Sequence, residues 1–263
     1  MAVKGGPAGG GYQVPGFSKG LRLIELLCAA RQPLGVSELS QQLGLNKPMV
    51  FRLLRTLLAA GWVVQDGEGP KYRMSLVPFH HASKVLQQMD LVRAASGPLE
   101  QLWTETGESV GVAVLDRDRL MYVLHHSGTR EVAIAGRVGA RYYLHASAPG
   151  KVLLAYADEA TRSPLLRGKL PAVTDKTVRD PEQLREELAR VRRQGYALDN
   201  QEYAAGGLCY AVPIFNHAQQ VVAALNVSVL TLHYNLRQLV DDLGPRLQAT
   251  ERVISRSLGA PPA

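Results

Sequence analysis

The chain has 263 residues, of which 46% are hydrophobic and 20% are charged, and its formal net charge is +7. This composition is that of an ordinary globular protein with one large or two modest cores, and the sequence contains no apolar run near the ~18 residues of a membrane-spanning helix. The two cysteines, Cys28 and Cys209, are far apart in the sequence. They exclude a disulfide framework and indicate a reducing compartment, the cytoplasm.

The positive charge is concentrated in the first third of the chain. Up to Gln88 there are 10 Lys and Arg against 4 Asp and Glu, a net charge of +6, which leaves 20 basic and 19 acidic residues for the remainder. A basic segment joined to a near-neutral one is typical of a nucleic-acid-binding domain joined to a domain with another function.

The first 16 residues are rich in glycine and contain no hydrophobic core segment. We expect a disordered tail there rather than a secretory signal. Ser18 is a candidate N-cap for a first helix over residues 19–31. The apolar side of this helix is expected to contain Leu21, Ile24, Leu27 and Cys28.

Two short helices joined by a tight turn are predicted between residues 36 and 62. Ser37 is a good N-cap for the first helix, and Gly44 ends it because glycine adopts the left-handed conformation of a helix C-terminus. Asn46 is placed to cap the second helix, and Pro48 falls in its first turn, where a missing N–H costs little. The second helix has an apolar face with a 3.6-residue period, made of Val50, Leu53, Leu54, Leu57 and Leu58.

The opposite face of the second helix is cationic, and no Asp or Glu occurs between Glu38 and Asp66. A helix with a positive N-terminus and cationic outer side chains suits a polyanion. This pattern is typical of a DNA-reading helix-turn-helix, whose second helix enters the major groove. The alternative is an ordinary helical hairpin with a solvated basic face. The residues predicted to contact DNA in this segment are Ser37, Lys47, Pro48, Met49, Phe51, Arg52 and Arg55.

A short β-hairpin is predicted directly after the second helix. Residues 62–65 and 71–74 have strand character and flank a polar, glycine-rich turn. Three helices and a hairpin make a winged helix-turn-helix over residues 17–75, with Lys71 and Arg73 on the wing beside a phosphate strand. A linker helix is predicted for residues 76–89.

The remainder, residues 90–263, is expected to form an α+β domain, because a series of strands has helices before and after it. Such an order favours an antiparallel sheet flanked by helices. Helices are predicted from residues 96–98 onward and over residues 147–156, 181–194 and 234–258, the last with a kink at Pro245. Strands are predicted over residues 109–116, 120–126, 131–135, 141–144, 196–203, 208–215 and 220–230.

Three segments of this domain are candidates for binding a ligand. The turn into the helix at residues 147–156 offers free N–H groups, which attract anions such as carboxylates. An acidic segment follows near the end of a strand, and Asn226 and Ser228 share one face of another strand. The candidate ligand-binding residues are His145, Ala148, Pro149, Gly150, Asp199, Glu202, Cys209, Asn226 and Ser228. Taken singly, each also fits a solvated turn, a half-exposed strand position or a small buried side chain.

Four sequence motifs, taken together, resemble the IclR family of bacterial transcriptional regulators. They are VSELSQQLGLNKPMVFRLLRTLLAAGWV, YYLHASAPGKVLLA, GYALDNQEYAAGGLCYAVPIF and VVAALNVSV, and they occur in the order and spacing of the family. The resemblance implies a homodimer or dimer of dimers with a winged helix-turn-helix, a linker helix and a GAF-like effector domain. Family members usually control catabolic operons, often as repressors, in response to small organic acids.

The resemblance also implies a ligand pocket formed by backbone N–H groups of the small-residue turn, by Asp199 and Cys209, and by Asn226 and Ser228. Pro149 departs from the family pattern because it lacks the N–H expected at its position, which argues against a glyoxylate- or pyruvate-like acid. Asn226 is more similar to the members that sense aromatic acids.

Three functions are therefore considered. The first is a DNA-binding regulator of a double-stranded operator, modulated by a small organic acid, with no metal or other cofactor. The second is an enzyme with Cys209 as nucleophile, which requires a base such as His145 beside the thiol. The third is an architectural DNA-binding protein without a ligand.

Overall fold

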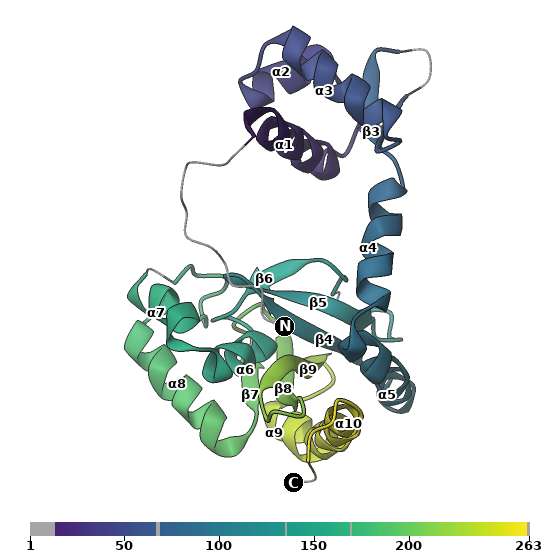
Figure 1. Ribbon diagram of the computed structural model, residues 1–263. Helices are drawn as coiled ribbons and strands as arrows, with labels where there is room; N and C mark the ends of the chain where they lie inside the picture. The colour runs from purple at the N-terminus through teal and green to yellow at the C-terminus, as the bar shows by residue number, and fades with distance from the viewer. Residues whose placement is uncertain (1–13, 67–68, 135, 169, 262–263) are drawn as a thin grey trace. The chain divides into compact units, whose positions relative to one another are not determined.

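The computed structural model describes residues 14–66, 69–134, 136–168 and 170–261, and the chain divides into two compact units, with the boundary in the sequence between Val85 and Leu86 (Figure 1). Among the described residues, no helix is both long enough and apolar enough to cross a bilayer.

The N-terminal unit is a winged helix-turn-helix. Its elements are α1 (Pro15–Ala29), β1 (Leu34–Gly35), α2 (Val36–Leu43), α3 (Lys47–Ala59), β2 (Val63–Gln65), β3 (Lys71–Met74) and the first part of α4 (Val77–Gln87). The strands form a sheet of order β1-β3-β2, in which β3 is antiparallel to both neighbours. A small core joins the helices to this sheet and contains Leu23, Leu27, Leu39, Leu43, Val50, Leu54, Val63 and Tyr72.

Several details of the predicted N-terminal unit were wrong. α1 begins at Pro15, four residues earlier than expected, with Val14 as N-cap and Ser18 inside the helix. The expected tail of residues 1–16 lies mostly outside the described residues, but Pro15 and Gly16 belong to α1. Cys28 is exposed rather than part of the core, because the buried stripe of this helix consists of Leu23 and Leu27.

The start of α2 also differs from the prediction. Its N-cap is Gly35 rather than Ser37, because the Glu38 carboxylate accepts the Gly35 N–H at 2.7 Å and thereby stabilises the first turn. Gly44 ends α2 in the left-handed conformation, as predicted. The Asn46 side chain accepts the Met49 N–H at 2.9 Å, which confirms the predicted cap of α3.

The C-terminal unit contains one six-stranded antiparallel sheet of order β6-β5-β4-β9-β8-β7. The strands are β4 (Ser109–Asp116), β5 (Arg119–His126), β6 (Arg141–Tyr143), β7 (Ala197–Asn200), β8 (Gly207–Phe215) and β9 (Val221–Leu230). The helices are α5 (Asp90–Thr106), α6 (Ala148–Tyr156), α7 (Glu159–Arg167), α8 (Pro181–Gln194), α9 (Leu236–Gln238), a π-helical turn (Leu239–Leu243) and α10 (Gly244–Ser257).

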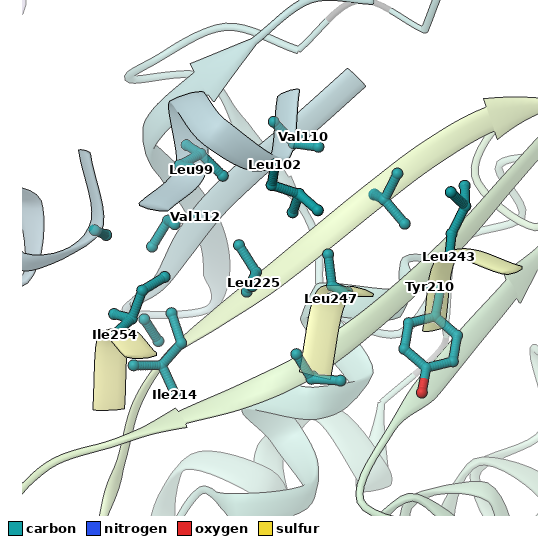
Figure 2. Close-up of a cluster of buried hydrophobic side chains, with 14 of the residues drawn as sticks. Leu99, Leu102, Val110, Val112, Tyr210, Ile214, Leu225, Leu243, Leu247 and Ile254 are labelled. Carbon is teal, nitrogen blue, oxygen red and sulfur yellow. The ribbon is translucent and has the colours of Figure 1, made fainter. Parts of the chain in front are cut away.

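Helices cover both faces of this sheet and enclose a separate core on each side (Figure 1). On one face, α5, the π-helical turn and α10 pack on β4, β8 and β9. Figure 2 shows side chains of this core, among them Leu99 and Leu102 of α5, Leu225 of β9 and Leu247 of α10. On the other face α6 packs on β8 and β9 and is itself covered by α8. The predicted α+β class with an antiparallel sheet is therefore confirmed.

Two predicted elements of the C-terminal unit were wrong. No strand forms over residues 131–134, and Ala135 of that predicted strand lies outside the described residues. α5 begins at Asp90 rather than near residue 96, and Pro98 lies inside the helix. The buried stripe Leu91, Ala95, Leu99 and Leu102 continues through the proline, so the burial of these side chains outweighs the loss of one backbone hydrogen bond.

Two further details concern the other helices. α7, with Pro164 in its interior, was not predicted because its polar sequence has only one buried residue, Leu166. The expected continuous C-terminal helix is instead divided into α9, the π-helical turn and α10, and Pro245 lies in the first turn of α10. A proline is tolerated in this first turn because its missing N–H has no helical partner there.

Gly150 is required by packing rather than by backbone conformation. A Cβ atom at this position of α6 would lie 2.3 Å from the carbonyl oxygen of Leu144, and backbone cannot move aside as a side chain can. We expect Gly150→Ala to lower the free energy of unfolding by about 3 kcal/mol, measured by urea denaturation. Gly97→Ala is the matched control, because Gly97 is an exposed helical glycine with no atom near its Cβ position. This control is expected to be neutral or to stabilise by about 1 kcal/mol. Equal stability of the two variants would contradict the packing argument.

Candidate functional site

The outer face of α3 is exposed and cationic. The exposed residues include Lys47, Pro48, Arg52 and Arg55, while Met49 is half-buried. Phe51 is also exposed, to 49%. Ser37 is exposed near the start of α2. The structure thus presents the predicted DNA-contacting side chains of these helices to solvent, apart from part of Met49.

The wing carries two further basic side chains. Lys71 and Arg73 are exposed and alternate on β3 with the buried Tyr72, as expected for a strand with one solvated face. The Arg73 Nε atom lies 3.5 Å from Asp66 Oδ1, and both side chains are more than half exposed. Such a surface ion pair contributes little, so Arg73 can exchange it for a phosphate at small cost.

The C-terminal unit contains a pocket lined by residues of β5, β6, β7, β8 and β9 and of the start of α6. It encloses about 550 Å³, including space that is open to solvent. Part of its lining is aromatic, and part is polar. The lining residues include Tyr122, His125, Tyr142, Ser147, Pro149, Asp199, Tyr203, Cys209 and Ser228.

The polar part of the pocket follows from the register of three strands. Asp199 on β7 is paired with Cys209 on β8, which is paired with Ser228 on β9. The Ser228 hydroxyl donates to Cys209 Sγ at 3.3 Å, and Asn226 Nδ2 donates to Ser228 Oγ at 3.2 Å and to Cys209 Sγ at 3.6 Å. The predicted grouping of Cys209, Asn226 and Ser228 is thus present, but Asn226 lies behind the pocket wall and does not line it.

The Cys209 thiol is not set up as a nucleophile. Burial raises its pKa to about 12, so the thiolate is not populated at neutral pH. Within the described residues its hydrogen-bond partners are Ser228, Asn226 and the Tyr210 carbonyl, and no histidine is among them. The His145 ring instead lies 2.9 Å from the Pro171 carbonyl oxygen. The enzyme alternative therefore lacks the base that it requires.

Asp199 is the acidic group of the pocket. It is 5% exposed, and its Oδ1 atom accepts the N–H groups of Glu202 at 2.6 Å and Tyr203 at 3.4 Å. Burial, together with the charge of Glu202, raises the pKa of this carboxyl to about 7, although the two N–H donors and Lys151 act in the opposite direction. Asp199 therefore changes its protonation state near neutral pH.

Glu202 does not line the pocket and belongs to a buried ionic cluster beneath it. The Lys151 ammonium, which is fully buried, lies 2.5 Å from Glu202 Oε1 and 2.7 Å from Glu187 Oε1 of α8. It also donates to the Leu198 carbonyl at 3.1 Å. This cluster joins α6, α8 and the segment after β7, so it holds the backbone around Asp199 in place.

The start of α6 contributes less than predicted. Pro149 lines the pocket, whereas His145, Ala148 and Gly150 are buried and do not. The absent side chain of Gly150 makes room for the Leu144 backbone instead. Of the nine predicted ligand-binding residues, the pocket is therefore lined by Pro149, Asp199, Cys209 and Ser228.

The aromatic wall was not predicted from the sequence. Tyr122 makes edge-to-face contacts with Tyr142 and His125, each with ring centroids 5.4 Å apart, and Tyr142 makes another with Tyr203 at 5.3 Å. A β-bulge shifts the register between β4 and β5 after Tyr122, so His125 rather than Leu124 faces the pocket. The alternation of side chains along a strand would have placed Tyr122 on the same face as Leu120, but it would have placed His125 on the opposite face.

The buried cluster around Lys151 yields a stability prediction. Lys151→Met removes the cation from the buried carboxylate of Glu202 and from the partly buried carboxylate of Glu187, so we expect the free energy of unfolding to fall by about 3 kcal/mol in urea denaturation. Lys176→Met is the control, because Lys176 is exposed, and its change is expected to stay within about 0.5 kcal/mol. If the free energy of unfolding fell by a similar amount in both variants, the cluster would have no special role in stability.

Comparison with known proteins agrees with this arrangement. Residues 17–67 match the IclR helix-turn-helix domain, and residues 83–256 match the C-terminal domain of the bacterial transcriptional regulator IclR. The chain is 34% identical over 227 residues to the HTH-type transcriptional regulator KdgR of Escherichia coli (strain K12), a match that covers 86% of each protein. It is also 34% identical over 230 residues to the transcriptional repressor IclR of the same organism, covering 86% of this chain and 83% of that protein.

Solved structures give the same result. An IclR homologue from Microbacterium hydrocarbonoxydans, complexed with 4-hydroxybenzoate, has a TM-score of 0.81 at 25% identity and covers 92% of this chain and 98% of its own. A regulator from Alicyclobacillus acidocaldarius has a TM-score of 0.80 at 28% identity and covers 94% of this chain and 100% of its own. The chain therefore belongs to the IclR family of bacterial transcriptional regulators, which are DNA-binding proteins with an effector domain and not enzymes.

Proposed function

We propose that this protein is a sequence-specific repressor of a catabolic operon, acting in the bacterial cytoplasm, whose DNA binding is modulated by a small aromatic acid. The proposal is supported above all by the presence, in one chain, of a basic recognition-type helix and a pocket lined by aromatic and polar residues. The DNA-binding domain comprises residues 17–75, the linker helix residues 76–89 and the effector-binding domain residues 90–263. The active form is a homodimer or a dimer of dimers.

The reading of DNA is assigned to α3. Arg52 makes the base-edge contact, because arginine bonds guanine in the major groove with two parallel hydrogen bonds. Lys47, Arg55, Lys71 and Arg73 mainly contact phosphates, which position the protein without reading sequence. The two recognition helices of a dimer occupy half-sites about one turn, ~34 Å, apart or a multiple of it.

The effector class follows from the chemistry of the pocket. Tyr122, Tyr142 and Tyr203 offer ring faces and edges to a planar ligand. Ser147, Ser228 and Asp199 supply polar contacts for a carboxylate or hydroxyl group. Pro149 takes one backbone donor away from the start of α6, which disfavours acids small enough to bind there alone. The bound 4-hydroxybenzoate in the structure from Microbacterium hydrocarbonoxydans supports the same class.

The effector changes DNA binding by favouring one arrangement of the two DNA-binding domains over another. The size of this change is limited by the difference in effector affinity between the two arrangements. A repressor is released from its operator when the effector prefers the arrangement that does not fit the half-sites.

The division of roles on the DNA-binding surface predicts two different mutant phenotypes. Arg52→Ala should lose the preference for an operator selected from random duplexes, by about 1–3 kcal/mol, because it removes a base contact. Arg73→Ala should weaken binding to all duplexes alike and reduce the salt dependence, because it removes a phosphate contact. Both are measured by fluorescence anisotropy at matched salt. Wild-type operator preference in Arg52→Ala would remove this residue from the base-reading set.

The effector assignment predicts a selective thermal shift. We expect 4-hydroxybenzoate or benzoate at millimolar concentration to raise the unfolding temperature of the full chain, since a ligand that binds only the folded state stabilises it. Acetate, which fills little of the pocket, is the matched control and should have a smaller effect. If no acid in a panel of aromatic and aliphatic carboxylates shifts the transition, the protein is better explained as a ligand-independent architectural DNA-binding protein.

A further inference from the structure

The charges beneath the pocket do not suit an anionic ligand. Lys151 is a cation that acts on Asp199, but it is shared between Glu187 and Glu202. With Asp199 ionised, this group of four residues has a net charge of −2. Within the described part of the chain, no Lys or Arg lines the pocket. An organic anion would therefore meet an excess of negative charge on entering.

The hydrogen bonds of Asp199 leave one oxygen for the ligand. Its Oδ1 atom accepts from the backbone N–H groups of Glu202 and Tyr203, which fixes the carboxyl orientation. The described residues give no donor to Oδ2, although the side chain lines the pocket. A carboxyl oxygen in this position can carry a proton and donate it to a hydrogen-bond acceptor.

We propose that Asp199 binds the effector acid in its protonated form, with its O–H donating to a carboxylate oxygen of the effector. The proton comes from solvent, so effector binding takes up one proton whenever Asp199 is ionised in the free protein. An ionised Asp199 would instead face the effector carboxylate as a like charge in a buried site, which is strongly unfavourable. The inference rests on the proposed acid effector, and it identifies the group that makes an anionic ligand acceptable to this pocket.

The other titratable groups around Asp199 are poorly placed to supply that proton. Burial lowers the pKa of His125 on β5, so its ring is neutral at pH 7 and above. Burial raises the pKa of Cys209 on β8 to about 12, and it raises the pKa values of Tyr122 and Tyr203, so these groups keep their protons throughout the neutral range. Burial also raises the pKa of Glu202, but Lys151 lies 2.5 Å from its Oε1 atom and acts in the opposite direction, and Glu202 does not line the pocket. The other titratable groups near Asp199 are Tyr142 on β6, Lys151 and Glu187. Asp199, with a pKa of about 7, is the group that exchanges its proton there.

The test is isothermal titration calorimetry of the full chain with benzoate, whose carboxyl group is ionised throughout the range from about pH 6 to pH 8.5. Titration in two buffers of different ionisation enthalpy measures the protons taken up. Because the pKa of Asp199 in the ligand-free protein is about 7, we expect proton uptake close to zero at about pH 6 and close to one proton per benzoate at about pH 8.5. The dissociation constant should rise about thirtyfold between these limits, because each pH unit above the pKa reduces the protonated fraction tenfold.

Two variants locate the proton. Asp199→Asn keeps an oxygen to accept the Glu202 N–H and gains an amide N–H to donate to benzoate, so it should still bind, without proton uptake and with a dissociation constant independent of pH. His125→Gln should retain the wild-type pH dependence. If His125→Gln lost the pH dependence of binding while Asp199→Asn kept it, the proton would be assigned to His125 and the proposal would be overturned.

The remaining outcomes separate this inference from the proposed function. Binding of benzoate by the wild type with constant affinity and no proton uptake overturns the protonated Asp199 but leaves the acid effector intact. Preferential binding of neutral benzamide at every pH shows that the pocket takes uncharged ligands, which overturns both. Absence of binding by benzoate and 4-hydroxybenzoate at every pH also overturns both.

Discussion

The register of β7, β8 and β9 is the constraint on which the pocket depends. It places Asp199, Cys209 and Ser228 in a row across three neighbouring strands, so that residues up to 29 positions apart in the sequence share one wall. Backbone hydrogen bonds of the sheet set this register, and a slip by one residue would turn every side chain of a strand to the opposite face. The buried Lys151 adds a second constraint, because its contacts with Glu187 and Glu202 hold the segment that follows β7.

These two constraints also explain the unusual electrostatics of the site. A buried ion cluster holds its shape only when each charge has a partner, and here two carboxylates share one ammonium. Burial of Asp199, together with the charge of Glu202, makes ionisation of that carboxyl unfavourable in the folded chain, although Lys151 acts in the opposite direction. A stable scaffold and a proton-binding pocket therefore arise from the same side chains.

The N-terminal unit follows a simpler logic. Its core is small, and the exposed face of α3 carries charges that no neighbouring carboxylate neutralises along the helix. Affinity for a duplex comes from this charge and is general, whereas selectivity depends on the few side chains that reach base edges.

The sequence by itself determined the elements whose signals are local. The cap at Asn46, the left-handed Gly44 and the period of Val50 and Leu54 defined the helix-turn-helix, and β4 and α8 have their predicted bounds because alternation and helical period need only neighbouring residues. Tertiary structure decided which candidates line the pocket. The Asn226 side chain donates to Cys209 and Glu202 pairs with Lys151, so neither lines the pocket. A bulge places His125 rather than Leu124 in the pocket wall. α5 likewise continues through Pro98, because the face that it buries is decided by the sheet rather than by the helix. Strand register, bulges and ion pairing depend on contacts between distant segments, so no local pattern encodes them.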